Sequence, residues 1–177
     1  MKKYILAAVM AVGGLVFTVK AQVKTSSQEV VPELVKQRET QKKAIISSYM
    51  GMKNGLVISD TQKTASSATE FSAALSQFKF KKLTLQQMNM ATSARISIKA
   101  LADQIAASSS IDDQRKNMEK LSEELWLIID KLKPENTVVY QQKCPMTGVT
   151  WVSNDKKIEN PYYPKNMLTC GEVTGEK

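Results

Sequence analysis

Two cysteines and two methionines stand close together near the C-terminal end of the sequence. They form the segments Cys144-Pro-Met146 and Met167-Leu-Thr-Cys170, in a chain of 177 residues that contains no histidine. Two thiols and two thioethers are soft ligands, which select ions such as Cu(I), Ag(I) or Hg(II) over Mg²⁺, Ca²⁺ or Mn²⁺. The four sulfur side chains are therefore candidate ligands of a soft-metal site.

The same two cysteines also permit a structural interpretation. Cysteines of exported proteins usually pair in a disulfide. Closing the loop from Cys144 to Cys170 would stabilise the fold by about 3–4 kcal/mol in the chain-entropy model. A disulfide would also remove both thiolates and leave only two thioethers, which are too weak to define a site alone. Both interpretations stay open, because a reduced metal site and a disulfide can be redox states of one protein.

The absence of histidine excludes several classes of enzyme. Ser-His-Asp and Cys-His nucleophile systems, HExxH zinc peptidases and CxxCH haem attachment all require an imidazole. The adjacent acid pairs Asp112-Asp113 and Glu123-Glu124 would diverge on a helix instead of sharing a proton, so we expect them on a solvated face. The sequence therefore predicts a binding or structural protein and not an enzyme.

The first 21 residues have the features of a secretory signal peptide. A basic start precedes an apolar run over residues 5–19, and Val19 and Ala21 provide the small residues of a cleavage site. The run is short for a membrane span. We expect a periplasmic or secreted protein that begins at Gln22 and has no membrane span after cleavage.

The net charge does not indicate a nucleic-acid partner. Cleavage would remove three of the 25 basic residues and leave 22 against 17 acidic ones, which lowers the net charge from +8 to +5. The remaining charges of both signs are interspersed along the chain instead of forming one basic stripe.

Four amphipathic patterns predict four helices. The first begins near Pro32, which suits a first turn because its missing N–H is not needed there. Asp60, the capping box of Thr84 and Gln87, and Ser110 are the expected N-caps of the next three. The side chains expected on the buried sides are Ile45, Tyr49, Met52 and Leu56; Ala65, Ala68, Phe71, Leu75 and Phe78; Leu85, Met88, Ala91, Ala94, Ile98, Leu101 and Ile105; and Ile111, Met118, Leu121, Leu125, Ile128 and Leu132.

Short connections between these helices favour antiparallel neighbours. The expected fold is therefore mostly α, an up-down-up-down four-helix bundle over residues 31–134. Two pairs of methionines, Met50 with Met52 and Met88 with Met90, lie two positions apart on these helices and point to different sides. We interpret them as core residues and not as chelating pairs.

The last part of the chain, residues 135–177, has a different composition. Its β-rich segments 138–140 and 149–152 flank a Cys-Pro-Met-Thr-Gly turn and predict a short hairpin, followed by turn and loop segments. Such a tail cannot bury a core of its own. We expect it to pack on the bundle in a single domain over 31–177, after a flexible stretch at 22–30. The expected anchors are the aromatic side chains Tyr140, Trp151, Tyr162 and Tyr163.

Several of these segments resemble a family that is catalogued only as a domain of unknown function. The likeness covers most of the chain after the signal peptide. Its tail motifs are Tyr140-x-x-x-Cys144-Pro-Met, Trp151-Val-Ser, Ile158-x-Asn160-Pro-Tyr and Met167-Leu-x-Cys170-Gly. Its helical motifs are Tyr49-x-x-x-Lys53-x-Gly-Leu-Val-x-x-Asp60 and Asp113-x-Arg115-x-x-Met118-x-x-Leu121-Ser.

The resemblance implies a function as well as a fold. Domains of this family occur alone behind a signal peptide, and as C-terminal extensions of periplasmic adaptor subunits of copper/silver-type efflux pumps. This implies copper binding by Cys144, Met146, Met167 and Cys170, with a heavy-metal efflux system or its adaptor subunit as partner. Members often carry a histidine where this chain has Lys143, so this chain is expected to bind the ion more weakly or with sulfur alone. We expect an exported Cu(I)-binding accessory protein; the alternative is a non-catalytic structural or interaction module with a stabilising disulfide.

Overall fold

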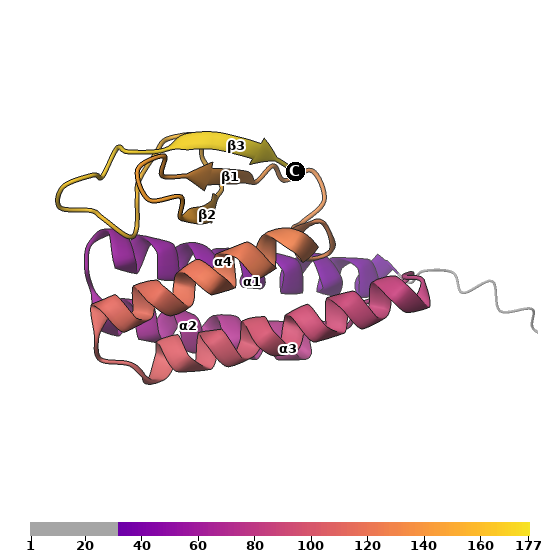
Figure 1. Cartoon of the computed structure of the whole chain (residues 1–177). Helices are drawn as coiled ribbons and strands as arrows, with labels where there is room; N and C mark the ends of the chain where they lie inside the picture. The colour runs from indigo at the N-terminus through magenta and orange to yellow at the C-terminus, as the bar shows by residue number, and fades with distance from the viewer. Residues whose placement is uncertain (1–31) are drawn as a thin grey trace, which may run out of the picture. The chain divides into compact units, whose positions relative to one another are not determined.

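The computed structural model describes residues 32–177, which form four helices followed by a small antiparallel sheet (Figure 1). The predicted signal peptide and the stretch 22–30 lie outside the described residues. The elements are α1 (Pro32–Val57), α2 (Thr61–Gln77), α3 (Leu85–Ala107), α4 (Ile111–Leu132), β1 (Tyr140–Lys143), β2 (Thr150–Ser153) and β3 (Glu172–Glu176). The predicted fold class, a four-helix bundle with a short C-terminal β segment, is confirmed.

The predicted caps set the helix boundaries. The Asp60 side chain accepts the N–H three residues later at 2.9 Å, and Ser110 does the same at 3.3 Å. Thr84 and Gln87 form both halves of the capping box, at 3.2 and 3.1 Å. Each cap pairs a backbone group that the first turn would otherwise leave without a partner. Each helix packs most extensively against a helix that neighbours it in the sequence.

The bundle interior contains most of the side chains expected there. Those with no exposed surface are Ile45, Tyr49, Met52, Leu56, Ala68, Phe71, Leu75, Phe78, Ile98, Ile105, Met118, Leu121, Leu125 and Leu132. Two expectations were wrong, because Leu85 is 80% and Met90 62% exposed. Leu85 is the first residue of α3, at the end of the bundle, so the apolar pattern continues beyond the last turn that neighbouring helices cover.

The C-terminal segment forms three strands in the order β2-β1-β3, with the central strand antiparallel to both neighbours. Lys143 lies opposite Thr150 of β2 and opposite Glu172 of β3. The hairpin of β1 and β2 was predicted, whereas β3 was not. Its sequence, Glu-Val-Thr-Gly-Glu, lacks the alternation of apolar residues that identifies a half-buried strand. The segment 172–176 is therefore a strand because it pairs with β1, and not because of its own sequence pattern.

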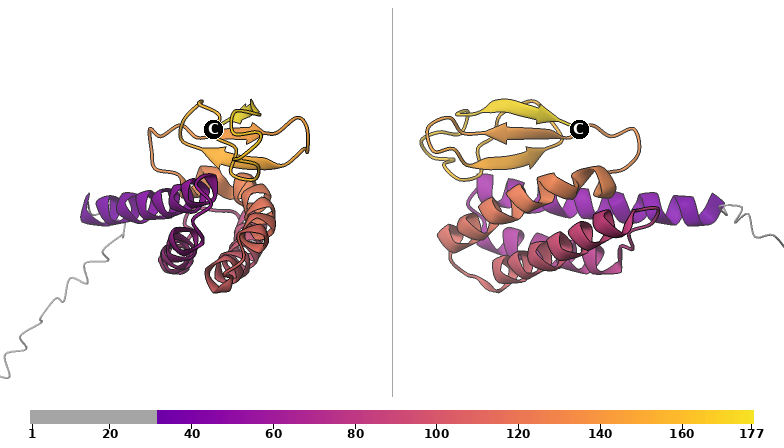
Figure 2. Two further views of the ribbon diagram at one scale, coloured as in Figure 1. Left: turned by 90° about the vertical axis from the view of Figure 1, so that its left-hand side faces the viewer. Right: turned by 45° about the vertical axis from the view of Figure 1, so that its right-hand side comes forward.

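The sheet lies over α1 and α4, on the side away from α2 and α3 (Figures 1 and 2). Among the aromatic residues of the tail, Trp151 is fully buried and Tyr162 nearly so, with their rings edge to face at 6.1 Å between centroids. Tyr140 is half-buried and Tyr163 lies at the surface. No helix of residues 32–177 has both the length and the apolar character needed to cross a bilayer.

Candidate functional site

The strand register brings the two cysteines together. Cys144 directly follows β1, and Cys170 lies two residues before the first residue of β3, which pairs with the last residue of β1. The two Sγ atoms lie 3.4 Å apart. Both are free thiols; Cys144 is buried and Cys170 is half-buried. Two residues 26 positions apart in the chain thus share one site.

A tight turn shapes the surroundings of Cys144. Its carbonyl accepts the N–H of Gly148 at 2.8 Å, and its own N–H donates to the carbonyl of Val149 at 2.9 Å. Gly148 closes the turn with φ of +79°, a left-handed conformation that glycine adopts at little cost. The turn directs the N–H groups of Met146 and Thr147 toward the Cys144 sulfur.

These contacts give the two thiols different acidities. Burial raises the pKa of Cys144, but hydrogen bonds from the Thr147 side chain, the Cys170 thiol and the N–H groups of Met146 and Thr147 outweigh it, so the pKa is lowered overall. The pKa of Cys170 is raised, first by its hydrogen bond with Cys144, then by burial and by the negative charge on Cys144. The hydrogen bonds of the turn therefore favour the thiolate form at Cys144 more than at Cys170.

Asn160 fixes the loop that carries Cys170. Its side-chain amide donates to the Cys170 carbonyl at 3.1 Å, while its oxygen accepts the N–H groups of Tyr162 and Tyr163 at 2.9 and 3.2 Å. Asn160 has no exposed surface. Sequence reasoning did not assign Asn160 a role, although the Asn-Pro dipeptide is a turn signal.

Close packing of Gly171 fixes the backbone next to Cys170. A Cβ atom on Gly171 would lie 3.0 Å from Cη2 of Trp151 and 2.8 Å from Cγ2 of Ile158, so only glycine fits there. The ring of Trp151 is itself held by its Nε1–H, which donates to the buried side chain of Gln142 at 2.6 Å. The position of Cys170 thus depends on close packing against a fixed indole.

Arg115 ties this loop to the bundle. From α4, it donates to the carbonyl of Pro161 at 3.0 Å, to the carbonyl of Leu56 at 3.1 Å and to Oγ of Ser59 at 2.9 Å. One guanidinium therefore joins α4, the end of α1 and the loop after Asn160. Its planar set of donors suits such a junction of carbonyl groups.

The two candidate methionines differ from the cysteines. The Met146 side chain is 75% exposed, while its backbone N–H faces both thiols. Met167 is half-buried and begins the turn before Cys170, whose N–H donates to the Met167 carbonyl at 3.0 Å. Within residues 32–177, no three Cys, Asp or Glu side chains gather as a metal cluster. The pair of thiols is thus the centre of the site, and thioether ligation stays a prediction.

Comparison with known protein families decides which family the chain is from. A family described as proteins of unknown function, DUF3347, matches residues 45–137, more than half of the chain. The chain belongs to this family. The DUF3347 match begins within α1 and ends before β1, so it covers most of the bundle and stops before both cysteines. No curated protein and no solved structure matches the chain.

Proposed function

We propose that this DUF3347 protein binds a soft metal ion, Cu(I) in the first instance, through Cys144 and Cys170. The observation that carries the proposal is the pair of free sulfur atoms 3.4 Å apart, close enough to share one ion after a small opening. Thiolate is the form that binds metal, and hydrogen bonds that stabilise it at Cys144 reduce the competition from protons. Thiolate softness favours Cu(I) over hard cations.

The proposal extends to the protein's role outside the site. The signal-peptide features of residues 1–21 support an exported, periplasmic or secreted protein. The tail motifs support an accessory role in which captured metal passes to a heavy-metal efflux system or its adaptor subunit. Met146 and Met167 would serve as auxiliary ligands, and no catalytic step is involved.

Competition with a chromogenic Cu(I) chelator, under anaerobic reducing conditions, tests the binding. The double variant Cys144→Ser/Cys170→Ser is expected to lose its ability to withdraw Cu(I) from the chelator, because hydroxyls are hard, weak ligands for this ion. Met146→Leu is expected to lower the affinity by no more than about tenfold, since its side chain is exposed. Met90→Leu, an exposed thioether on α3, is the matched control. Unchanged affinity in the double variant would overturn the proposal.

The same sulfur distance favours a second candidate, a structural module whose disulfide fastens the tail. An intact mass measured on protein isolated without reductant separates the two. A mass two hydrogens light without metal supports the disulfide. Two full thiols, or a bound copper ion in place of thiol protons, support the metal site.

A further inference from the structure

The connection between α2 and α3 presents lysines to solvent in a fixed arrangement. Its side chains alternate, with Phe78 and Phe80 buried and Lys79 and Lys81 exposed. This is the period of an extended chain, in which successive side chains point to opposite sides. Lys82 follows, also exposed, with φ of +56°, a left-handed conformation that residues other than glycine seldom adopt. Conformational strain of this kind is concentrated at functional positions.

Two arginines clamp the buried side of this connection. The Arg38 guanidinium lies 4.7 Å from the centre of the Phe78 ring and donates to the Lys79 carbonyl at 2.8 Å. Arg95 lies 5.8 Å from the centre of the Phe80 ring and donates to the Phe78 carbonyl at 3.0 Å. The two phenyl rings meet edge to face at 5.4 Å. The exposed lysines therefore project from a rigid base instead of a loose loop.

This end of the bundle carries cations with few compensating acids. The sequence has no Asp or Glu between Glu70 and Asp103. A hollow of about 270 Å³ beside the connection is lined by three glutamines, Leu34 and the cations Arg38, Lys79 and Lys81, without a carboxylate. The first half of α1 contains two acids, Glu33 and Glu39. Glu39 is paired with Lys42 and accepts the backbone N–H of Glu135, which follows α4, while Glu33 is exposed.

Aliphatic side chains protrude at the same end. Figure 1 shows the start of α1 and the start of α3 at one end of the bundle, and the hydrogen bond from Arg38 to the Lys79 carbonyl joins α1 to the connection that precedes α3. Leu34 and Val35 are about half exposed, and Leu85 and Met90 are more exposed still. Cations beside protruding aliphatic groups are the combination with which proteins bind lipid headgroups and insert at the bilayer interface.

We propose that this basic end, defined by Lys79, Lys81, Lys82, Leu34 and Leu85, binds the surface of an anionic phospholipid bilayer. The lysines contact headgroup phosphates, and the leucines enter the interface between headgroups and acyl chains. An acidic protein would be attracted by the same charges. The bilayer is favoured because single protruding aliphatic side chains among lysines are the combination that inserts between headgroups.

Vesicle sedimentation tests this on the full protein as it is purified from producing cells, with its N-terminus established by intact mass. The protein is expected to sediment with vesicles of equimolar phosphatidylglycerol and phosphatidylcholine, not with phosphatidylcholine alone, and to be released by raised salt. The triple variant Lys79→Gln/Lys81→Gln/Lys82→Gln is expected to bind about 100-fold more weakly, since each lysine near an anionic surface contributes about fivefold.

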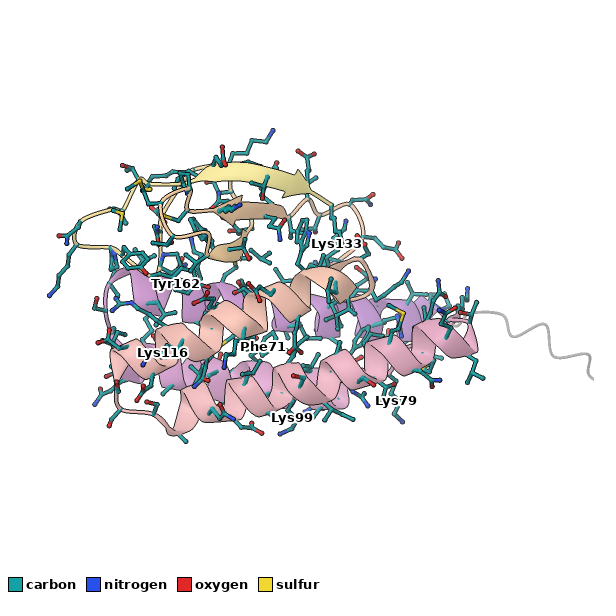
Figure 3. All side chains as sticks on the ribbon, in the orientation of Figure 1. Phe71, Lys79, Lys99, Lys116, Lys133 and Tyr162 are labelled. Atoms are coloured by element: carbon teal, nitrogen blue, oxygen red, sulfur yellow. The ribbon has the colours of Figure 1, made fainter. Side chains whose placement is uncertain are left out.

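A matched triple variant controls for net charge. Lys63, Lys116 and Lys120 are exposed, and Lys116 lies at the opposite end of the bundle from Lys79 (Figure 3). Changing these three to Gln removes the same charge and is expected to leave binding within about twofold. Equal loss in both triple variants would overturn the proposal, because attraction would then follow total charge.

A single variant separates a bilayer from an acidic protein. Leu85→Ser keeps every charge and is expected to weaken vesicle binding several-fold, because an apolar side chain no longer enters the interface. Binding to polyglutamate as tight as to vesicles, with Leu85→Ser having no effect on either, would assign the surface to an acidic protein and overturn the proposal.

Discussion

The phenol oxygen of Tyr49 accepts the backbone N–H of Val152 at 3.0 Å, which joins the middle of α1 to strand β2. The same phenol lies 2.7 Å from Oγ of Ser122, and Ser122 lies 3.4 Å from the hydroxyl of Tyr162. All four residues are buried. Because an unpaired buried polar group is costly, this network stabilises the observed placement of the tail on the bundle. It thereby also sets where the cysteine pair lies.

Replacing Tyr49 with Phe is expected to lower the free energy of unfolding by about 1–3 kcal/mol. The change leaves the N–H of Val152 buried without its acceptor, and Ser122 loses one partner. Urea denaturation followed by circular dichroism measures it. Tyr163→Phe is the control, because that hydroxyl belongs to a surface residue. An equally stable Tyr49→Phe variant would show that the network does not hold the tail.

The stability of the fold is expected to fall at alkaline pH. Burial is the main cause that raises the pKa of Tyr49 to about 12, against hydrogen bonds with Ser122 and Val152 that lower it. Between its usual value near 10 and that value, the folded state keeps a proton that the unfolded state releases, so stability decreases as pH rises. Unfolding free energies at about pH 9, 10, 11 and 12, from below the usual pKa to the raised one, measure the slope. The slope should be smaller in Tyr49→Phe.

Asn160→Ala is expected to loosen the loop that carries Cys170. It removes the donor to the Cys170 carbonyl and the acceptor of two backbone N–H groups, so we expect a loss of about 1–3 kcal/mol of stability. Cu(I) affinity should fall with it, since the second thiolate is no longer held in place. Amide hydrogen exchange over residues 160–170 locates the effect. Asn166→Ala, at an exposed position of the same loop, should change neither quantity.

Two glycine variants are expected to destabilise the tail for different reasons. In Gly171→Ala the new methyl would meet Trp151 and Ile158 at 3.0 Å or less, and such overpacking costs about 1–3 kcal/mol. In Gly148→Ala the methyl meets nothing within 4 Å, but φ of +79° is unfavourable by about 1–2 kcal/mol. Tryptophan fluorescence, to which Trp151 contributes alongside Trp126, should change in the first variant only. The same fluorescence change in both would contradict this distinction.

Mild oxidation is expected to convert the thiol pair to a disulfide without refolding. The sulfur atoms are already 3.4 Å apart, and closing this loop should stabilise the protein by about 3–4 kcal/mol. Intact mass should fall by two hydrogens, and Cu(I) binding should disappear because both thiolates are consumed. Reductant should restore binding. Retention of full Cu(I) affinity by the oxidised protein would place the metal elsewhere.

The sequence predicted the bundle well because its signals are local. The capping box of Thr84 and Gln87 is defined by two residues three positions apart, and helix formation depends on just such short-range contacts. The sequence singled out both cysteines, but the register that brings their sulfur atoms to 3.4 Å depends on β3. Its residues become a strand only by pairing with β1, so no single segment reveals that geometry. Asn160 was missed for a related reason, because its partners include the carbonyl of Cys170, ten residues away.

The strand order β2-β1-β3 also determines when the site is completed during synthesis. Strand β1 and its hairpin partner β2 leave the ribosome together, whereas Cys170 and β3 follow more than twenty residues after Cys144. In a nascent chain, Cys144 therefore lacks its native sulfur neighbour until Cys170 and β3 have been synthesised. A chain cut short before residue 170 has a single thiol, which is free to form mixed disulfides. The late strand thus makes an intact dithiol a chemical mark of a chain that has been synthesised as far as β3.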